Sequence, residues 1–218
     1  MFKEIFFKNI FFWGSILYFI LASLFAYYLG KEESFLIFNK HYIPELGQFY
    51  KYFTHIGDGF FIVGLALLLL FVKYYYSLVV FTTYAIPSLV VQFLKRIVFP
   101  DASRPAKYFF WDKPYKLTFT DGVDVAINNS FPSGHTASAF ALFFCLSVLV
   151  KHTLFRFLFL VMAINLAISR VYLCEHFFTD TLAGAVISFV ICIPILFYLE
   201  NSPFKSKLNG NLLHKNVV

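Results

Sequence analysis

Long apolar segments alternate with short polar stretches along almost the whole chain. Six of them lie near residues 10–29, 56–72, 76–94, 135–150, 154–173 and 180–199, and residues 95–134 form one long, more polar insertion. Crossing a hydrocarbon core of about 30 Å takes about 20 helical residues, and each segment reaches or approaches that length. The pattern predicts an all-α fold in which residues 1–218 form a single membrane domain, a bundle of six transmembrane helices.

Composition supports a polytopic membrane protein. Of the 218 residues, 60% are hydrophobic and 14% are charged, and the mean hydropathy is +0.72. An ordinary soluble domain carries about 25% charged residues, so the composition excludes that class. Residues 30–33, Gly-Lys-Glu-Glu, follow the first segment where a cleaved signal peptide would need small residues, so we expect that segment to remain as a helix.

The distribution of charge predicts the orientation of the bundle. If the amino terminus is cytoplasmic, the inner side carries eight of the 18 basic residues and two of the 12 acidic ones. An excess of Lys and Arg on the cytoplasmic side is typical of membrane proteins. The net charge of +6 therefore indicates topology, and we do not expect nucleic-acid binding. The short loops favour a bacterial inner membrane, with residues 95–134 on the outer, periplasmic side.

The polar residues with the most chemical interest all fall on this outer side. Lys95, Arg96 and Arg104 follow the third segment, residues 132–135 (Pro-Ser-Gly-His) open the fourth, and residues 169–180 join the last two. Cationic groups at membrane depth are costly and indicate function. On a helix, His176 and Asp180 would lie one turn apart on one face, so that the carboxylate could orient the imidazole. The sequence thus predicts an anion site.

Two of these stretches resemble a known family. Pro-Ser-Gly-His at 132–135, and Ser169-Arg170 followed after five residues by His176 and after three more by Asp180, resemble the second and third signatures of the phosphatidic acid phosphatase type 2 superfamily. That superfamily includes membrane lipid phosphatases, glucose-6-phosphatases and soluble vanadium haloperoxidases. The resemblance covers roughly residues 55–200.

The first signature of the superfamily is only partly present. It consists of a Lys, six further residues and then Arg-Pro. Arg104-Pro105 matches its end, but eight residues separate Lys95 from Arg104, and Arg96 also misses the spacing. Whether Lys95 or Arg96 takes the place of the lysine stays open from the sequence.

The resemblance implies a membrane phosphatase that needs neither a metal nor another cofactor. His176 would attack phosphorus and form a phosphohistidine, while Asp180 fixes its tautomer. His135 would protonate the leaving oxygen and later activate water. The phosphate oxygens, which gain charge in the transition state, would be bound by Arg104, Arg170, Ser133, Gly134 and Lys95.

An aromatic cluster in the long loop favours a lipid substrate over a soluble sugar phosphate. It consists of Tyr108, Phe109, Phe110, Trp111, Tyr115 and Phe119. Such residues form a belt at the headgroup level or a groove for acyl or prenyl chains, and both interpretations stay open. The possible substrates include undecaprenyl pyrophosphate, phosphatidylglycerophosphate, phosphatidic acid and lipid A. Membrane lipids would surround the chain, and no obligate protein partner is expected.

Other interpretations also stay open. A non-catalytic lipid-binding or transport protein would explain six helices with intramembrane charge, and a haloperoxidase-like relative would share the motifs. His55 and Asp58 are interpreted as interfacial polar residues beside the pocket. Residues 128–130, Asn-Asn-Ser, match a glycosylation acceptor, but a glycan there would crowd the Pro-Ser-Gly-His stretch. Four acids of the loop are interpreted as solvated residues rather than a calcium site: Asp101, Asp112, Asp121 and Asp124.

Overall fold

A computed structural model describes residues 6–113 and 115–213, and all regular secondary structure in these ranges is helical. The long helices are α1 (Ile10–Lys40), α3 (Gly59–Leu69), α4 (Tyr74–Phe93), α6 (Gly134–Leu149), α7 (Thr153–Tyr172) and α8 (Phe178–Asn201). Shorter helices are α2 (Pro44–Phe53), α5 (Pro105–Lys107) and α9 (Phe204–Lys207). Helical turns cover Thr54–Gly57, Leu94–Val98 and Tyr108–Asp112. The predicted all-α fold is confirmed, and each predicted segment contains one long helix.

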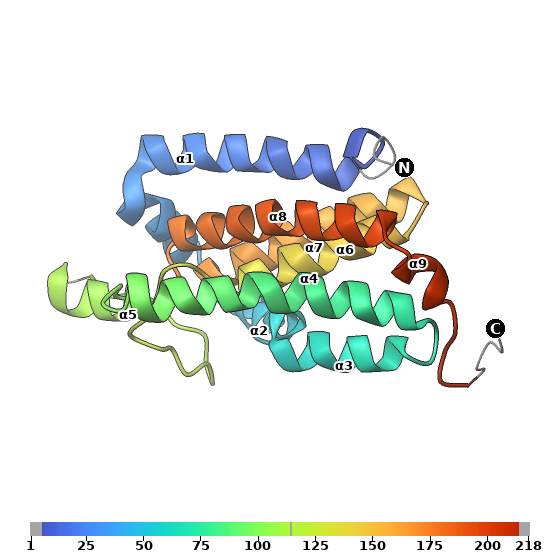
Figure 1. The fold of residues 1–218 in the computed structure, drawn as a ribbon. Coiled ribbons are helices and arrows are strands. Elements are labelled where there is room, and N and C mark those ends of the chain that lie inside the picture. The colour runs from blue at the N-terminus through green and yellow to red at the C-terminus, as the bar shows by residue number, and fades with distance from the viewer. Residues whose placement is uncertain (1–5, 114, 214–218) are drawn as a thin grey trace.

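The first helix is longer than expected because it continues beyond a break. Gly30 has φ +73°, a conformation that side chains other than glycine rarely adopt, and the residues after it leave the axis of the first part. Figure 1 shows the chain turning there from the long first part of α1 toward the rest of the bundle. The second part of α1 thereby reaches the loops at one end of the molecule.

Helix α6 forms the centre of the bundle. It packs against α4, α7 and α8, while α1 packs against α7 and α8, and α3 packs against α4. Every residue from Thr136 to Cys145 is buried, so the helix lacks the exposed polar face that a surface helix would show. The residues that begin α6 are therefore held rigidly among the neighbouring helices.

Four helices are long and apolar enough to cross a membrane: α1, α4 with the following turn, α7 and α8. The segment Pro44–Gly57 and α3, which meet at 53°, together make a fifth candidate. Helix α6 is apolar but has only 16 residues. The chain is thus a membrane protein with four to five candidate spans among the described residues, and the expected count of six stays a prediction.

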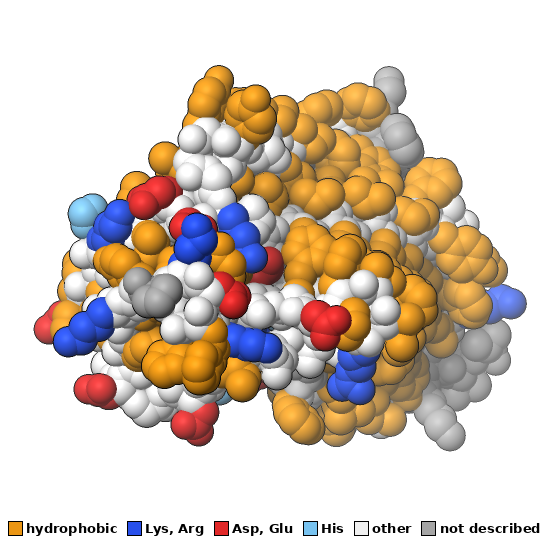
Figure 2. Space-filling view, turned by 90° about the vertical axis from the view of Figure 1, so that its left-hand side faces the viewer, with side chains coloured by type: hydrophobic (Ala, Val, Ile, Leu, Met, Phe, Trp, Pro, Cys, Tyr) orange, Lys and Arg blue, Asp and Glu red, His pale blue; other side chains and the backbone are white. Residues whose placement is uncertain are grey.

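The two ends of the bundle differ in character. In Figure 1 the start of α1 and α9 lie at one end, and α5 with the loop around it lies at the other. Figure 2 views the molecule from the α5 end, where Lys, Arg, Asp and Glu side chains gather, whereas hydrophobic side chains cover much of the upper and right-hand surface. The charged side chains on this face are therefore concentrated at the α5 end of the bundle.

Packing between α6 and α8 depends on one glycine, which gives a test of the fold. A Cβ at Gly184 would lie 2.3 Å from the carbonyl oxygen of Ser133. We expect Gly184→Ala to lower the unfolding free energy by about 1–3 kcal/mol, because overpacking displaces backbone.

Gly64→Ala is the matched control, since a Cβ at Gly64 in α3 has no atom within 4 Å. It should be neutral or stabilising by up to about 1 kcal/mol. Thermal unfolding in detergent measures both variants, and equal melting temperatures would contradict the close α6–α8 contact.

Candidate active site

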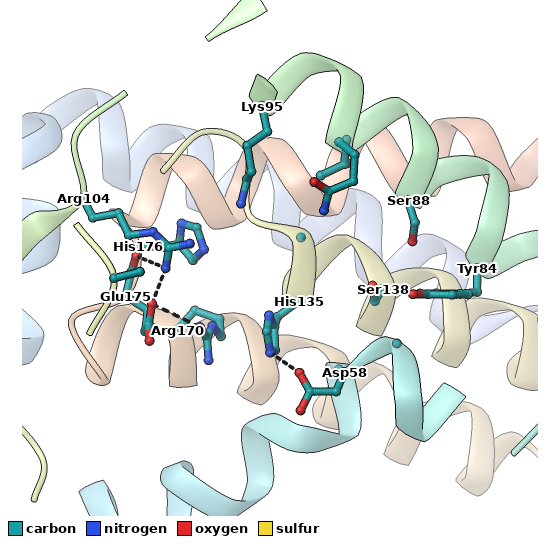
Figure 3. A pocket seen from close by; sticks show the side chains of 16 residues that line it. Asp58, Tyr84, Ser88, Lys95, Arg104, His135, Ser138, Arg170, Glu175 and His176 are labelled. Atoms are coloured by element: carbon teal, nitrogen blue, oxygen red, sulfur yellow. Dashed lines mark hydrogen bonds and ion pairs between the residues drawn. The ribbon is translucent and has the colours of Figure 1, made fainter. Parts of the chain in front are cut away.

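A cavity of about 450 Å³ opens at the α5 end of the bundle. Its walls come from the junction before α3, from α4, from the start of α6, from the end of α7 and from the turn that follows α7. Figure 3 shows several ionisable side chains gathered around it, namely Asp58, Lys95, Arg104, His135, Arg170, Glu175 and His176. The fold thus brings together residues that are far apart in the sequence.

Lys95 is the lysine that reaches this cavity. It lies in the π-helical turn Leu94–Val98 that continues α4, and it is only 8% exposed. Arg96 is exposed and does not line the cavity. The longer interval between Lys95 and Arg104 is therefore accommodated by the turns between them, and both side chains face the same space.

Arg104 and Arg170 both line the cavity and are each anchored by hydrogen bonds. Arg104 Nε donates to the carbonyl oxygen of Asn128 at 2.9 Å, and its Nη1 donates to that of Glu175 at 3.2 Å. Arg170 Nη1 donates to Thr54 Oγ1 at 2.8 Å. The buried Nε of Arg170 has no hydrogen-bond partner among the described residues.

Glu175 joins the two arginines, and sequence reasoning missed it. Its Oε2 forms an ion pair with Arg104 Nη1 and lies 3.5 Å from Arg170 Nη2. Because an isolated buried charge is very costly, a carboxylate between the buried guanidinium of Arg170 and the partly buried one of Arg104 stabilises their arrangement. Its place beside His176 within the third motif was the available signal, but the sequence does not show which way the side chain points.

His176 lies in a turn, so the expectation that His176 and Asp180 share a helix is wrong. Helix α7 ends at Tyr172, and α8 begins at Phe178. The turn is closed by the backbone N–H groups of Glu175 and His176, which both donate to the carbonyl oxygen of Arg170, at 3.0 and 3.1 Å. This tight turn places His176 beside Arg170 and at the cavity wall.

Asp180 still faces His176, although Asp180 lies in the first turn of α8 and His176 lies in the turn before that helix. As the third residue of α8, its Oδ2 accepts a hydrogen bond from the backbone N–H of Phe177 at 3.0 Å, which is half of a capping box. Ser130 Oγ donates to the same oxygen at 2.5 Å. His176 Nδ1 lies 3.5 Å away from it, within ion-pair range but beyond a good hydrogen bond. Ser130, seen earlier only as part of a glycosylation acceptor, thus orients this carboxylate.

The surroundings of His176 favour its neutral form. Its side chain is 1% exposed, and burial together with the charges of Arg104, Lys95 and Arg170 holds its pKa well below the usual value of 6.5. A neutral imidazole keeps the lone pair that a nucleophile needs. This histidine is therefore suited to attack and poorly suited to donate a proton.

Ser133 and Gly134 lie at the start of α6, but only Gly134 lines the cavity. Ser133 is fully buried, caps the helix by accepting a bond from the backbone N–H of Thr136 at 3.5 Å, and does not line the cavity. Gly134 does line the cavity, and a Cβ there would project into open space. The free volume at Gly134 lies at a helix N-terminus, where backbone N–H groups favour an anion.

His135 faces the cavity from the first turn of α6. Its Nε2 lies 2.5 Å from Asp58 Oδ1, so Asp58 is a partner of a site residue rather than a simple interfacial acid (Figure 3). The contact joins residues 77 positions apart, and the sequence pattern did not reveal it.

The aromatic cluster of the long loop does not line the cavity. Phe109 is buried against Phe35 and Phe177, at centroid distances of 5.4 and 6.1 Å, and it attaches the loop to the second part of α1. Phe110 and Trp111 are largely exposed, as expected of side chains at a headgroup border. The four loop acids considered for calcium are all exposed, and the described residues contain no His, Cys, Asp and Glu group able to hold a metal ion.

The fold is a bundle of apolar, membrane-type helices with a cavity at one end that basic side chains line. Comparisons with known proteins identify the family. The family model of the PAP2 superfamily matches residues 75–203, so the chain belongs to the PAP2 superfamily. The family inferred from the two motifs is thereby confirmed.

Two solved structures share the fold. LpxE of Aquifex aeolicus superposes with a TM-score of 0.64 at 24% identity, over 77% of this chain and 95% of that one. The first transmembrane PAP2-type phosphatidylglycerolphosphate phosphatase of Bacillus subtilis gives 0.62 at 24% identity, over 88% and 97%. No curated protein matches the sequence.

The position of Glu175 gives a test of the anion site. Glu175→Gln keeps the size of the side chain but removes the negative charge that faces Arg104 and Arg170. Inorganic phosphate should then bind about tenfold more tightly, since about 1.4 kcal/mol is modest for charges about 4 Å apart at low polarity.

Calorimetric titration of the purified protein with phosphate measures this affinity. Glu33→Gln is the control, because Glu33 pairs with Lys40 on the exposed surface and should change nothing. Weaker phosphate binding by Glu175→Gln would mean that the charge chiefly holds the arginines in place.

Proposed function

We propose that this protein is a membrane phosphatase that hydrolyses a phosphate monoester or pyrophosphate of a lipid through a phosphohistidine. One observation carries the proposal: the buried, neutral His176 meets Lys95, Arg104 and Arg170 in a single cavity. Three cations around one nucleophile fit a phosphoryl group, whose three equatorial oxygens gain charge during transfer.

In the first half of the reaction, His176 Nε2 attacks phosphorus while the bond to the leaving oxygen breaks. Asp180 lies on the Nδ1 side of the ring and stabilises the positive charge that the ring acquires. His135, across the cavity, donates a proton to the leaving oxygen. The basic side chains and the N–H groups at Gly134 bind the phosphate oxygens, as Glu175 gives up its place between the arginines.

In the second half, a water molecule attacks the phosphohistidine. His135, now neutral, accepts a proton from the water as the P–N bond breaks and inorganic phosphate forms. Ser133 would act indirectly in this scheme, by fixing the start of α6 and with it His135 and Gly134.

The environment of the cavity supports a lipid substrate. The cavity wall continues along α4, a helix without charged residues, through Tyr84, Ser88 and Gln92. Exposed Phe110 and Trp111 flank the same end of the molecule. Undecaprenyl pyrophosphate, phosphatidylglycerophosphate, phosphatidic acid and lipid A type phosphates are the candidate substrates.

We further propose that the chain crosses a bacterial inner membrane six times, with the site on the periplasmic side. This rests on the excess of Lys and Arg in the opposite loops and on the polar character of the α5 end. In α4, α6, α7 and α8, every charged side chain lies in a first or last turn, which is unfavourable for a transport path through the middle of the bundle.

Replacing the nucleophile tests the function. His176→Ala should lower phosphate release from every accepted lipid by at least about 10⁴-fold, as removal of a nucleophile does in other covalent catalysts. Release is measured on a panel of the four lipid classes in detergent micelles, with and without chelator. Undiminished turnover in the variant would refute the phosphohistidine mechanism. If the wild type released no phosphate from any of the four lipid classes, the proposed phosphatase activity would be refuted.

Substitutions of two adjacent basic residues test whether Lys95 takes the place of the lysine in the first signature. Lys95→Ala removes a buried cation from the cavity and should reduce kcat/KM by about 10²–10³-fold, as loss of one transition-state donor does. Arg96→Ala, the matched control, removes an exposed cation one residue away and should reduce it less than about twofold. Equal effects of the two changes would contradict the assignment of Lys95.

A further inference from the structure

Residues 57–59, Gly-Asp-Gly, bring a backbone bend unusually close to the site. A Cβ at Gly57 would lie 2.9 Å from the carbonyl oxygen of His135, and a Cβ at Gly59 would lie 2.1 Å from Tyr84 Oη. A side chain at Gly57 would push the bend away from the backbone of α6, and one at Gly59 would displace the side chain of Tyr84. The two glycines therefore allow the residue between them, Asp58, to reach His135.

The carboxylate of Asp58 is not used to cap a helix. Asp58 occupies the N-cap of α3, a position where aspartate usually accepts a bond from the next backbone N–H groups, yet its side chain makes no such bond. Instead Oδ1 lies 2.5 Å from His135 Nε2, and Oδ2 lies 2.6 Å from His55 Nδ1. Both carboxylate oxygens are thus engaged by histidines.

We propose that Asp58 is a positioning residue that orients His135 for both proton transfers, with His55 holding the second carboxylate oxygen. This inference rests on the proposed function. With Nε2–H donated to Asp58, the other ring nitrogen, Nδ1, is the one that exchanges a proton with the substrate. Its proton goes to the leaving oxygen as the bond from phosphorus to that oxygen breaks and the P–N bond forms. A water proton returns to Nδ1 as the new P–O bond forms and the P–N bond breaks.

A second cavity supports this arrangement. It has a volume of about 250 Å³ and shares His135, Arg170 and Glu175 with the first cavity. Its remaining ionisable side chains are Lys51, His55 and Asp124. His55 is 66% exposed, so the line from His135 through Asp58 to His55 runs from the substrate cavity to the surface.

A purely structural role for the Asp58–His135 pair is disfavoured by its exposure. Each side chain is 31% exposed, and ion pairs in contact with solvent contribute only about 0–1 kcal/mol to stability. The geometry that the pair fixes is therefore of more consequence than the energy it supplies. An aspartate that holds one tautomer and orientation of a histidine is a recurrent arrangement for proton transfer.

The test compares substrates whose leaving groups differ in their need for a proton. In full-length Asp58→Asn, kcat for short-chain phosphatidic acid should fall about 100-fold with little change in KM, in line with the loss of general acid–base catalysis. With p-nitrophenyl phosphate, whose leaving group departs without a proton, phosphorylation of His176 should stay near the wild-type rate. Release of phosphate should then be slow, so that a burst of about one equivalent of p-nitrophenol precedes steady turnover and phosphohistidine accumulates in alkali-quenched samples, in which its P–N bond is stable.

Controls separate this inference from the proposed function. Asp101→Asn changes an exposed acid that lines neither cavity and should leave all rates unchanged. His55→Ala should give the same pattern as Asp58→Asn with a smaller loss, because Oδ1 still meets His135.

The outcomes are distinct. Wild-type turnover of the lipid by Asp58→Asn, while His176→Ala is inactive, overturns the role of Asp58 and leaves the phosphatase standing. If Asp58→Asn loses both the burst with p-nitrophenyl phosphate and the turnover of lipid, the role of Asp58 is also overturned, because general misfolding would lower both activities. Activity retained in His176→Ala instead overturns the phosphohistidine itself.

Discussion

The concentration of buried positive charge at one end of an apolar bundle is the constraint on which the site depends. Lys95, Arg170 and, in part, Arg104 are removed from water and close together, which is unfavourable without compensating anions and hydrogen bonds. Glu175 supplies the anion, while Thr54 and the carbonyl oxygen of Asn128 accept further bonds. The basic side chains of the cavity are thus held in place by contacts within the protein, and in the proposed reaction the phosphate would replace some of these contacts.

The packing of α6 against α8 fixes the relative positions of the helix starts that surround the two histidines. Gly184 lets α8 approach the carbonyl oxygen of Ser133, and the N–H of Ser133 donates to the carbonyl oxygen of Asp180 at 3.0 Å. The start of α6, which carries His135, is therefore fixed to the start of α8, which carries Asp180. A backbone bond thus sets the distance between the two helix starts, and the side chains of Ser133 and Asp180 fix each start further by capping bonds.

Features with a local cause could be predicted from the sequence, and features set by distant contacts could not. The hydrophobic pattern predicted five of the six long helices to within a few residues, and the start of the first, because burial in a bundle or in lipid determines where they run. The turn at His176 and the continuation of α1 past Gly30 were missed, since both depend on how neighbouring elements pack. Glu175 and Asp58 were unassigned because a single sequence does not show which distant side chain a carboxylate meets.

The two histidines of the cavity differ in a way that supports the proposed division of roles. His176 is enclosed among cations, its nearest carboxylate oxygen is 3.5 Å away and already accepts two other bonds, and its pKa lies well below the usual value. His135 is partly exposed and lies 2.5 Å from a carboxylate oxygen of Asp58. The first environment favours a neutral ring, which can attack phosphorus. At His135 burial and the charge of Arg170 also favour a neutral ring, but the carboxylate of Asp58 opposes them and stabilises the proton that His135 carries in the proposed reaction. His135 therefore has a carboxylate oxygen within hydrogen-bond distance that can hold a protonated ring, whereas His176 has none, and this difference favours His135 as the acid of the proposed reaction.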